Sequence, residues 1–382
     1  MNWLSDELAS LKNRGLYRSL STIGSAQTPR ILKDGRELIL LSSNNYLGLT
    51  THPKVKKAAL EAIEQYGTGA GGSRLTTGNT ELYNSLEERI AKFKGAEDAL
   101  VFSTGYMANT GTISSLMKNG DLILSDELNH ASIIDGCRLS RAEVVVYPHR
   151  DVSFIEKALR VSKHSRKVIV TDGVFSMDGD IAPLPEIVEL AEKYDAMVMV
   201  DDAHATGVLG KHNRGTPDYF NVSVDVNMGT LSKALASVGG YVSGSAELID
   251  YLRNRARPFI YSTALPPPVV AAAKAAIDVI EEENPAKQLW QNIAMYKKGL
   301  AEMGFTVESE TQIIPIMTGE TENTIKAASE LERLGVFAPG IRPPTVPEGK
   351  GRIRTSVMAT HSECDIKEAL YAISVIKEKY RL

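Results

Sequence analysis

Residues 197–204, MVMVDDAH, decide the fold of this chain. Four apolar residues in a row, with no polar side chain among them, are typical of a strand that is buried on both faces of a parallel sheet. Asp201 ends the run, and a carboxylate at the end of a buried strand is costly unless a cation or hydrogen-bond donors meet it. Asp201 therefore indicates either a cap for the next segment or a bound ligand at this end of the strand.

Similar short apolar runs lie on either side of this stretch. We expect strands at 99–102, 122–124, 144–147, 168–171, 197–200 and 224–228. Stretches of helical periodicity alternate with some of these runs, which predicts an α/β fold with a mainly parallel sheet flanked by helices. Because ligands of such sheets bind at the carboxyl ends of the strands, the polar residues that follow each run are the first candidates for function.

The domain organisation follows from length and from breaks in the pattern. A chain of 382 residues is expected to form about two domains. The prolines at 266–268 and the pair Asn284-Pro285 interrupt the helical pattern, so we predict a large domain at 51–283 and a smaller α+β domain at 284–382. Antiparallel strands of the smaller domain are expected at 305–308, 313–319 and 351–358, and residues 1–50 are predicted to join it.

Composition excludes several classes of protein. The 43 basic and 47 acidic residues give a net charge of −4, which argues against nucleic-acid binding. The two cysteines, Cys137 and Cys364, form no CxxC pair, so neither a metal site nor a disulfide scaffold is expected. The most apolar stretch, 269–280, contains Lys274 and Asp278 and is too short to span a membrane. These features predict a cytoplasmic protein with no membrane partner.

A glycine motif raises a competing hypothesis. Residues 67–72, GTGAGG, match the dinucleotide fingerprint GxGxxG, which favours a nicotinamide-binding α/β protein. That fingerprint must follow a strand and open a helix, whereas helical periodicity precedes these glycines. We therefore favour a sharp turn or a close approach of the backbone as their explanation.

Individual polar residues after the strands are ambiguous. Lys233 in GTLSKA (229–234) is either a solvated surface charge or a covalent nucleophile, and Thr230 beside it offers a hydroxyl for a phosphate. His204 and His130 are each either packed structural histidines or ligands. Gly105-Tyr106 begins a predicted helix, whose free N–H groups suit a phosphate but also fit a plain helix start.

Taken together, eight segments resemble the α-oxoamine synthases, a family of fold-type I enzymes that use pyridoxal 5′-phosphate (PLP). The segments are SSNNYLGL (42–49), GSRLTTGN (72–79), SDELNHASIIDG (125–136), TDGVFSMDGD (171–180), VDDAHATGVLG (200–210), GTLSKA (229–234), YSTALPP (261–267) and GRIRTS (351–356). The resemblance covers essentially the whole chain. It implies the fold-type I architecture, with a seven-stranded sheet in the large domain.

The resemblance also implies roles for single residues. Lys233 would form the Schiff base with PLP, Asp201 would pair with the ring nitrogen and His204 would bond the ring hydroxyl. His130 would stack on the ring. The remaining implied cofactor contacts are Gly105, Tyr106, Ser176, Thr230, and, to the phosphate of the cofactor in the partner subunit, Ser262 and Thr263. The family pattern thus implies a homodimer with shared active sites. A protonated ring nitrogen makes PLP an electron sink, which gives Asp201 a reason to be charged and buried.

The implied reaction condenses an amino acid with an acyl thioester and releases carbon dioxide. Arg354 matches the family's carboxylate-binding arginine, which Asn44 would assist, with His130 also facing the substrate. A planar guanidinium can hold a carboxylate by two hydrogen bonds. This fixes which bond at Cα breaks first.

Within the family, GSRLTTGN and residues 340–347 (GIRPPTVP) look most like members that join L-alanine to a pimeloyl thioester in biotin synthesis. Thr345 and Arg18 match family positions assigned to substrate contact, and Arg18 or Arg342 could meet a carboxylate on the acyl chain. Each arginine is also explained as an ordinary surface residue. Glycine-using members, such as glycine C-acetyltransferases, remain the alternative. The acyl carrier is either coenzyme A or a carrier protein.

Overall fold

The computed structural model of the chain describes residues 3–382, which divide into two compact units. The first unit comprises the residues up to Gly48 together with Met177–Gly179 and Lys287–Leu382. The second comprises Leu49–Ser176 and Asp180–Ala286. Each unit has its own sheet or sheets, so each is described separately.

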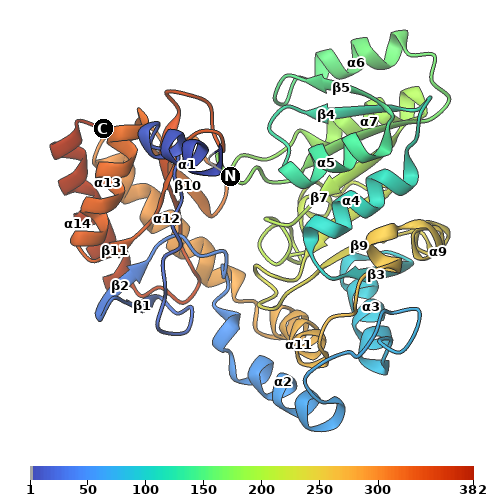
Figure 1. The fold of residues 1–382 in the computed structure, drawn as a ribbon, viewed down its shortest axis with the longest axis horizontal. Helices are drawn as coiled ribbons and strands as arrows, with labels where there is room; N and C mark the ends of the chain where they lie inside the picture. Colours follow the sequence, from blue (N-terminus) through green and yellow to red (C-terminus); the bar gives the residue numbers. More distant parts are fainter. Residues whose placement is uncertain (1–2) are drawn as a thin grey trace. The chain divides into compact units, whose positions relative to one another are not determined.

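A seven-stranded sheet in the order β3-β9-β8-β7-β6-β4-β5 forms the centre of the second unit (Figure 1). Its strands are β3 (Asp98–Phe102), β4 (Leu122–Asp126), β5 (Glu143–Tyr147), β6 (Lys167–Asp172), β7 (Met197–Asp201), β8 (Val226–Thr230) and β9 (Gly240–Gly244). Neighbouring strands from β8 to β5 pair in parallel, and only β9 runs antiparallel to its neighbours. The predicted α/β fold with a mainly parallel seven-stranded sheet is confirmed.

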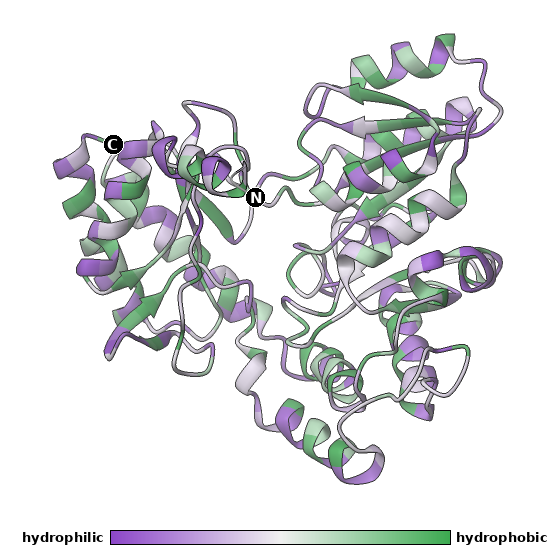
Figure 2. Cartoon of the chain, viewed as in Figure 1, coloured by the Kyte–Doolittle hydropathy of each residue, from purple (hydrophilic) through white to green (hydrophobic). Residues whose placement is uncertain are grey.

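The central strands of this sheet are buried on both faces, which explains why β6 and β7 are apolar without alternation. In β6, Val168 and Val170 belong to one core and Ile169 to the other. The strands at the middle of the sheet are accordingly mostly green in the hydropathy colouring of Figure 2. The first core is covered by α4 (Gly105–Leu116), α5 (Ala131–Ser140), α9 (Ala246–Arg255) and α10 (Arg257–Ile260), and the second by α6 (Val152–Val161) and α7 (Leu184–Tyr194).

The strand β9 is absent from the sequence-based prediction. Its sequence, Gly-Tyr-Val-Ser-Gly, has glycine at both ends and looks like a loop. The structure gives Gly240 a packing reason, because a Cβ added there would lie 2.6 Å from the Cα of Gly105. The start of α4 therefore lies directly against β9, and a glycine makes this approach possible.

The remaining elements of the second unit surround the sheet. They are the 3₁₀ turn η1 (Leu49–Thr51), α2 (Pro53–Tyr66), α3 (Glu81–Lys94), α8 (Thr216–Phe220) and α11 (Pro267–Glu283). Gly67 and Gly95 follow α2 and α3 with φ of 78° and 71°, a left-handed region that glycine enters without strain, so each glycine ends its helix. None of the helices within residues 3–382 combines the length and the apolar character needed to cross a bilayer.

The first unit contains two three-stranded sheets, β1-β2-β11 and β10-β13-β12. Its elements are α1 (Trp3–Asn13), β1 (Arg30–Lys33), β2 (Arg36–Leu40), α12 (Ala286–Glu302), β10 (Ile313–Gly319), α13 (Thr321–Arg333), β11 (Val336–Phe337), β12 (Gly340–Ile341), β13 (Gly351–Ser356) and α14 (Glu363–Tyr380). The antiparallel pair of β10 and β13 is confirmed. The strand expected at 305–308 is wrong: this segment alternates apolar and polar residues, but it belongs to no strand.

Candidate active site

A cavity of about 250 Å³ opens at the carboxyl ends of the parallel strands of the second unit. Its lining consists of Thr104, Gly105, Tyr106, Asn109, His130, Ser132, Asp172, Ser176, Asp201, Ala203, His204, Met228, Thr230, Ser232 and Lys233. The lining therefore brings together eight of the ten cofactor-binding residues that the sequence predicts. They come from five separate loops, so only the sheet makes them neighbours.

Asp201 occupies the end of β7 and is 5% exposed. Its Oδ2 accepts a hydrogen bond from Asn109 Nδ2 at 2.7 Å, and its Oδ1 accepts one from the backbone N–H of Ala203 at 2.8 Å. These two donors stabilise a carboxylate that has lost most of its water. The side chain lines the cavity, where it can meet a cationic N–H group of a ligand.

Lys233 and His204 meet inside the same cavity. The Nζ atom of Lys233 lies 2.7 Å from Nε2 of His204. An ammonium group only donates, so the neutral imidazole accepts at Nε2 when Lys233 is protonated. This contact holds the amine of Lys233 at one place in the cavity and supplies a group that can exchange a proton with it.

His130 is held in one orientation by a chain of hydrogen bonds that starts at Asp201. Asn109 Nδ2 donates to Asp201 and also to Ser132 Oγ at 2.9 Å. The hydroxyl of Ser132 then donates to His130 Nδ1 at 2.7 Å, and this nitrogen also accepts from the Ser132 backbone N–H. Nδ1 is thus an acceptor, and the ring's proton lies on Nε2. Burial, helped by the charge of Lys233, lowers the pKa of His130, so its ring is a neutral, flat surface in the cavity.

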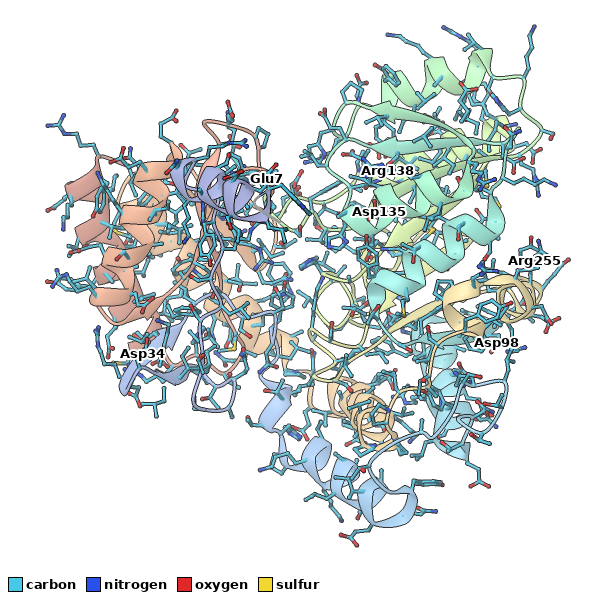
Figure 3. The ribbon with its side chains drawn as sticks, viewed as in Figure 1. Glu7, Asp34, Asp98, Asp135, Arg138 and Arg255 are labelled. Carbon is cyan, nitrogen blue, oxygen red and sulfur yellow. The ribbon has the colours of Figure 1, made fainter. Side chains whose placement is uncertain are left out.

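The start of α4 forms another side of the cavity. The first amides of a helix, here those of Gly105 and Tyr106, lack carbonyl partners in a preceding turn and attract anions. Thr104 caps the helix by accepting from the Met107 N–H at 3.0 Å. The hydroxyl of Tyr106 bonds Asp135, which also pairs with Arg138 at 3.2 Å; Figure 3 labels both residues on α5.

These side chains fit a flat, cationic ring that carries an anionic group. Asp201 supplies a buried negative charge, the helix start supplies N–H donors, and Thr230 and Ser232 supply hydroxyls that lie 2.8 Å apart. Asn109 Oδ1 is buried and has no hydrogen-bond partner, which leaves an acceptor in the lining. The amine of Lys233 completes a set that suits an aldehyde-bearing cofactor such as PLP.

Ser262 and Thr263 do not line this cavity. The backbone carbonyl of Thr263 accepts from the hydroxyl of Ser103 at 3.1 Å, and Thr263 forms an isolated antiparallel bridge with Ser73. Ser262 Oγ lies 3.8 Å from the sulfur of Met107. Both residues thus lie beside the start of α4, and their predicted role toward a partner subunit stays a prediction.

In the first unit, Arg354 and Asn44 meet as the sequence predicts. Arg354 on β13 is 8% exposed, and its Nη2 donates to Asn44 Oδ1 at 3.2 Å and to the hydroxyl of Tyr46 at 3.4 Å. Tyr46 in turn donates to Asn44 Oδ1 at 2.9 Å. Burial raises the pKa of Tyr46, so its hydroxyl stays protonated and acts as a fixed donor. The arginine is therefore held in place before any ligand binds.

Arg18, Thr345 and Arg342 also come together in the first unit. Arg18 Nη2 lies 3.4 Å from Thr345 Oγ1. Arg342 donates to the backbone carbonyls of Gly15 at 2.7 Å and Tyr17 at 2.8 Å. Arg342 therefore holds the segment that carries Arg18, and this leaves Arg18 as the better candidate for contact with a substrate carboxylate.

Sequence reasoning missed several residues of the two sites, and three of them matter most for the geometry. Asn109 lies on a helix with no distinctive motif, and only the fold brings it to Asp201. Asp172 ends β6 beside Asp201 within the quoted segment TDGVFSMDGD, and its position after a buried strand is the signal that could have identified it. Tyr46 lies within SSNNYLGL, two residues from Asn44.

The nicotinamide hypothesis is wrong, because its glycines do not lie between a strand and a helix. Gly67 is the residue that ends α2, and the next helix, α3, begins only at Glu81. No strand leads into residues 67–72, and no helix N-terminus follows them closely enough to hold a pyrophosphate.

Comparison with known proteins gives a consistent result. The model of the aminotransferase class I and II family matches residues 36–373. The 8-amino-7-oxononanoate synthase of Geobacter sulfurreducens is 52% identical over 98% of this chain and 97% of the relative. The enzyme of the same name from Thermoanaerobacter pseudethanolicus is 50% identical over 100% of this chain and 98% of the relative. A serine palmitoyltransferase from S. paucimobilis, solved with a bound PLP-myriocin aldimine, has a TM-score of 0.94 and 34% identity, covering 100% of this chain and 98% of that one.

Proposed function

Because the chain belongs to the aminotransferase class I and II family, we propose that it joins L-alanine to a pimeloyl thioester and forms 8-amino-7-oxononanoate for biotin synthesis. The reaction releases carbon dioxide and the thiol. The observation that carries this proposal is the meeting of Lys233, Asp201, His204 and His130 in one cavity at the carboxyl ends of the strands. Relatives named 8-amino-7-oxononanoate synthase, with about 50% sequence identity over nearly the full length, support the choice of substrates.

The cofactor is PLP, which, when bound, withdraws the electron pair that forms at the substrate's Cα. Asp201 would hold a proton on the ring nitrogen by its negative charge. Lys233 would bind the cofactor covalently and would remove and return the proton at Cα, with His204 Nε2 as its hydrogen-bond partner. His130 presents a neutral ring, so it can stack on the cofactor without a charge that competes for Asp201.

Arg354 is proposed to bind the α-carboxylate of the amino acid. Replacing Arg354 with alanine is expected to raise the KM for alanine by at least about 100-fold, because the paired hydrogen bonds to a carboxylate are lost. The absorbance of bound PLP should change little, because no cofactor contact is removed. Steady-state kinetics and an absorption spectrum of the same preparation test both statements. A variant that loses its PLP absorbance would show that Arg354 serves the cofactor.

Arg18 is proposed to bind the distal carboxylate of the pimeloyl chain, with Thr345 beside it and Arg342 holding its segment. Either coenzyme A or a carrier protein would carry the thioester, and both would leave this assignment unchanged. We also propose a cytoplasmic homodimer in which Ser262 and Thr263 reach the cofactor phosphate of the partner subunit. Two free thiols, Cys137 and Cys364, support a reducing compartment.

The substrate assignment is tested by comparing two substrate pairs. The value of kcat/KM with alanine and a pimeloyl thioester is expected to exceed that with glycine and an acetyl thioester by at least about tenfold, because a pocket loses 1–3 kcal/mol for each missing methyl or methylene group. Steady-state assays of released thiol measure both. A preference for the glycine pair would instead make the protein a glycine C-acetyltransferase, with the same cofactor chemistry.

A further inference from the structure

His149 lies between two carboxylates outside the cofactor cavity. Its Nδ1 is 3.0 Å from Asp126 Oδ1, and its Nε2 is 2.7 Å from Asp180 Oδ2. An ionised carboxylate only accepts hydrogen bonds, so both ring nitrogens must carry protons to make both bonds. The ring is therefore an imidazolium ion, and it packs edge-on against Phe175 with centroids 4.4 Å apart.

The acids around His149 explain why a cation is needed there. Asp126, Asp172 and Asp201 end the three neighbouring strands β4, β6 and β7. Burial, and then the charge of Asp201, raises the pKa of Asp172 well above its ordinary value, which favours the neutral form of this carboxyl. Asp201 serves the cofactor. His149 lies directly against the carboxylate of Asp126, whose side chain is 1% exposed, and so places a positive charge beside it.

The other charged groups near His149 do not replace it. Arg150 Nη1 lies 3.5 Å from Asp180 Oδ2, but its side chain is 41% exposed. Glu127 meets His149 through the backbone N–H, at 2.9 Å, rather than through the ring. Burial lowers the pKa of His149, but the hydrogen bonds and charges of Asp126 and Asp180 outweigh it and raise the value to about 9. The ring thus keeps its charge at neutral pH.

Each carboxylate that His149 binds organises a loop of the cofactor cavity. Asp126 accepts the backbone N–H groups of Leu128 at 2.9 Å and Arg150 at 3.0 Å, and the loop that it starts leads to His130. Asp180 closes the loop that carries Ser176, since its carbonyl accepts the Phe175 N–H at 3.0 Å. His130 and Ser176 both line the cavity.

We propose that His149 is a positioning residue for PLP: as an imidazolium bridge between Asp126 and Asp180, it fastens together the loops that present His130 and Ser176. The inference rests on the proposed function in one respect, namely that the cavity holds PLP. Without the bridge, the carboxylates of Asp126 and Asp180 would face each other with no imidazolium between them. Their repulsion would then push the two loops apart, because the Arg150 side chain that pairs with Asp180 is exposed and its charge is screened by water.

The test compares His149→Gln with His212→Gln. His212 also pairs with one aspartate, Asp218, at 2.9 Å, but it is 51% exposed and does not line the cavity. The Kd for PLP, measured by absorbance titration of the dialysed, folded protein, is expected to rise at least about tenfold in His149→Gln. It should stay within about twofold of the wild type in His212→Gln. Equal Kd values in His149→Gln and the wild type would overturn the proposal.

A rescue variant separates charge from packing. Adding Asp180→Asn to His149→Gln removes one of the two facing carboxylates, so the Kd for PLP is expected to return to within about threefold of the wild type. If His149 only filled space, the second substitution would weaken binding further, and the proposal would be wrong. A wild-type protein that binds no PLP at all would instead refute the proposed function.

The charge of His149 can be measured directly in the wild-type protein. Its folded pKa, about 9, is above the ordinary 6.5, so its contribution to stability is complete below about pH 6.5 and is lost as the pH rises through 9. NMR titration of the histidine ring, assigned with His149→Gln or, should that variant not fold, with Asp180→Asn, should give a pKa above 8. A value near 6.5 would contradict the bridge.

Discussion

Replacing Lys233 with alanine is expected to remove the covalent link to PLP and to lower kcat/KM by at least about 1000-fold, because we propose that this one amine both binds the cofactor and moves the Cα proton. The structure gives a reason to choose this lysine, because its Nζ lies 2.7 Å from His204 Nε2 inside the cavity that Asp201 lines. The change truncates one side chain at the wall of a cavity, so the fold should be retained.

The measurement is direct. Borohydride reduction of the wild type, followed by peptide mass mapping, should place the PLP adduct on Lys233. The variant should show no adduct and no absorbance of bound PLP after dialysis. Lys211→Ala is a matched control, since Lys211 is an exposed lysine of the same unit outside the cavity, and it should leave both signals unchanged. An adduct on any other lysine would reject the assignment of the cavity.

The parallel strands could be predicted because burial on both faces leaves a visible mark in the sequence. Val168, Ile169 and Val170 point alternately into two cores, so all three are apolar. Gly240–Gly244 lacks this apolar pattern. Its first residue, Gly240, allows the start of α4 to approach closely and does not fill a core. The segment 305–308 shows the reverse case. Its residues alternate apolar and polar as in a strand, but the segment pairs with no other strand of the described structure.

The candidate site was predictable where its residues follow strands directly. Asp201, Lys233 and His130 occupy such positions, and the family resemblance supplied their roles. Asn109 could not be found in this way, because its amide reaches Asp201 across 92 positions of sequence and its helix has no motif. Contacts of this kind depend on the packing of whole elements, which no local pattern encodes. The buried charge of Lys94 was missed for the same reason.

Replacing Lys94 with methionine is expected to lower the free energy of unfolding by about 3–5 kcal/mol, the usual effect of removing one partner of a buried ion pair. The side chains of Lys94 and Asp202 are 3% and 0% exposed, and Nζ lies 3.0 Å from Asp202 Oδ2. Burial disfavours the charge of Lys94, but Tyr241 and Asp202 outweigh it, so its pKa is raised and it stays charged. Methionine would leave the Asp202 carboxylate buried without its cation.

Water is poorly placed to replace the lost amine. A Cβ added to Gly173 or Gly215 would lie 2.6 or 2.0 Å from an oxygen of Asp202, so the backbone encloses this carboxylate on two sides. Its remaining donors, the hydroxyl and N–H of Thr216 and the amide of Asn227, are neutral. They can solvate the carboxylate but cannot cancel its charge, and the cost of burying that charge remains.

Urea denaturation of the PLP-bound protein measures this loss, with Lys92→Met as the control. Lys92 lies on the same helix, α3, but is exposed, so its replacement should change stability by less than about 0.5 kcal/mol. Adding Asp202→Asn to Lys94→Met removes the unpaired charge and should recover most of the stability. If the double variant is no more stable than Lys94→Met, the loss comes from packing around the lysine stem. Recovery would instead show that the loss comes from the unpaired charge of Asp202, the residue that follows Asp201 at the end of β7, and would link the stability of the fold to the strand end proposed to meet the cofactor ring.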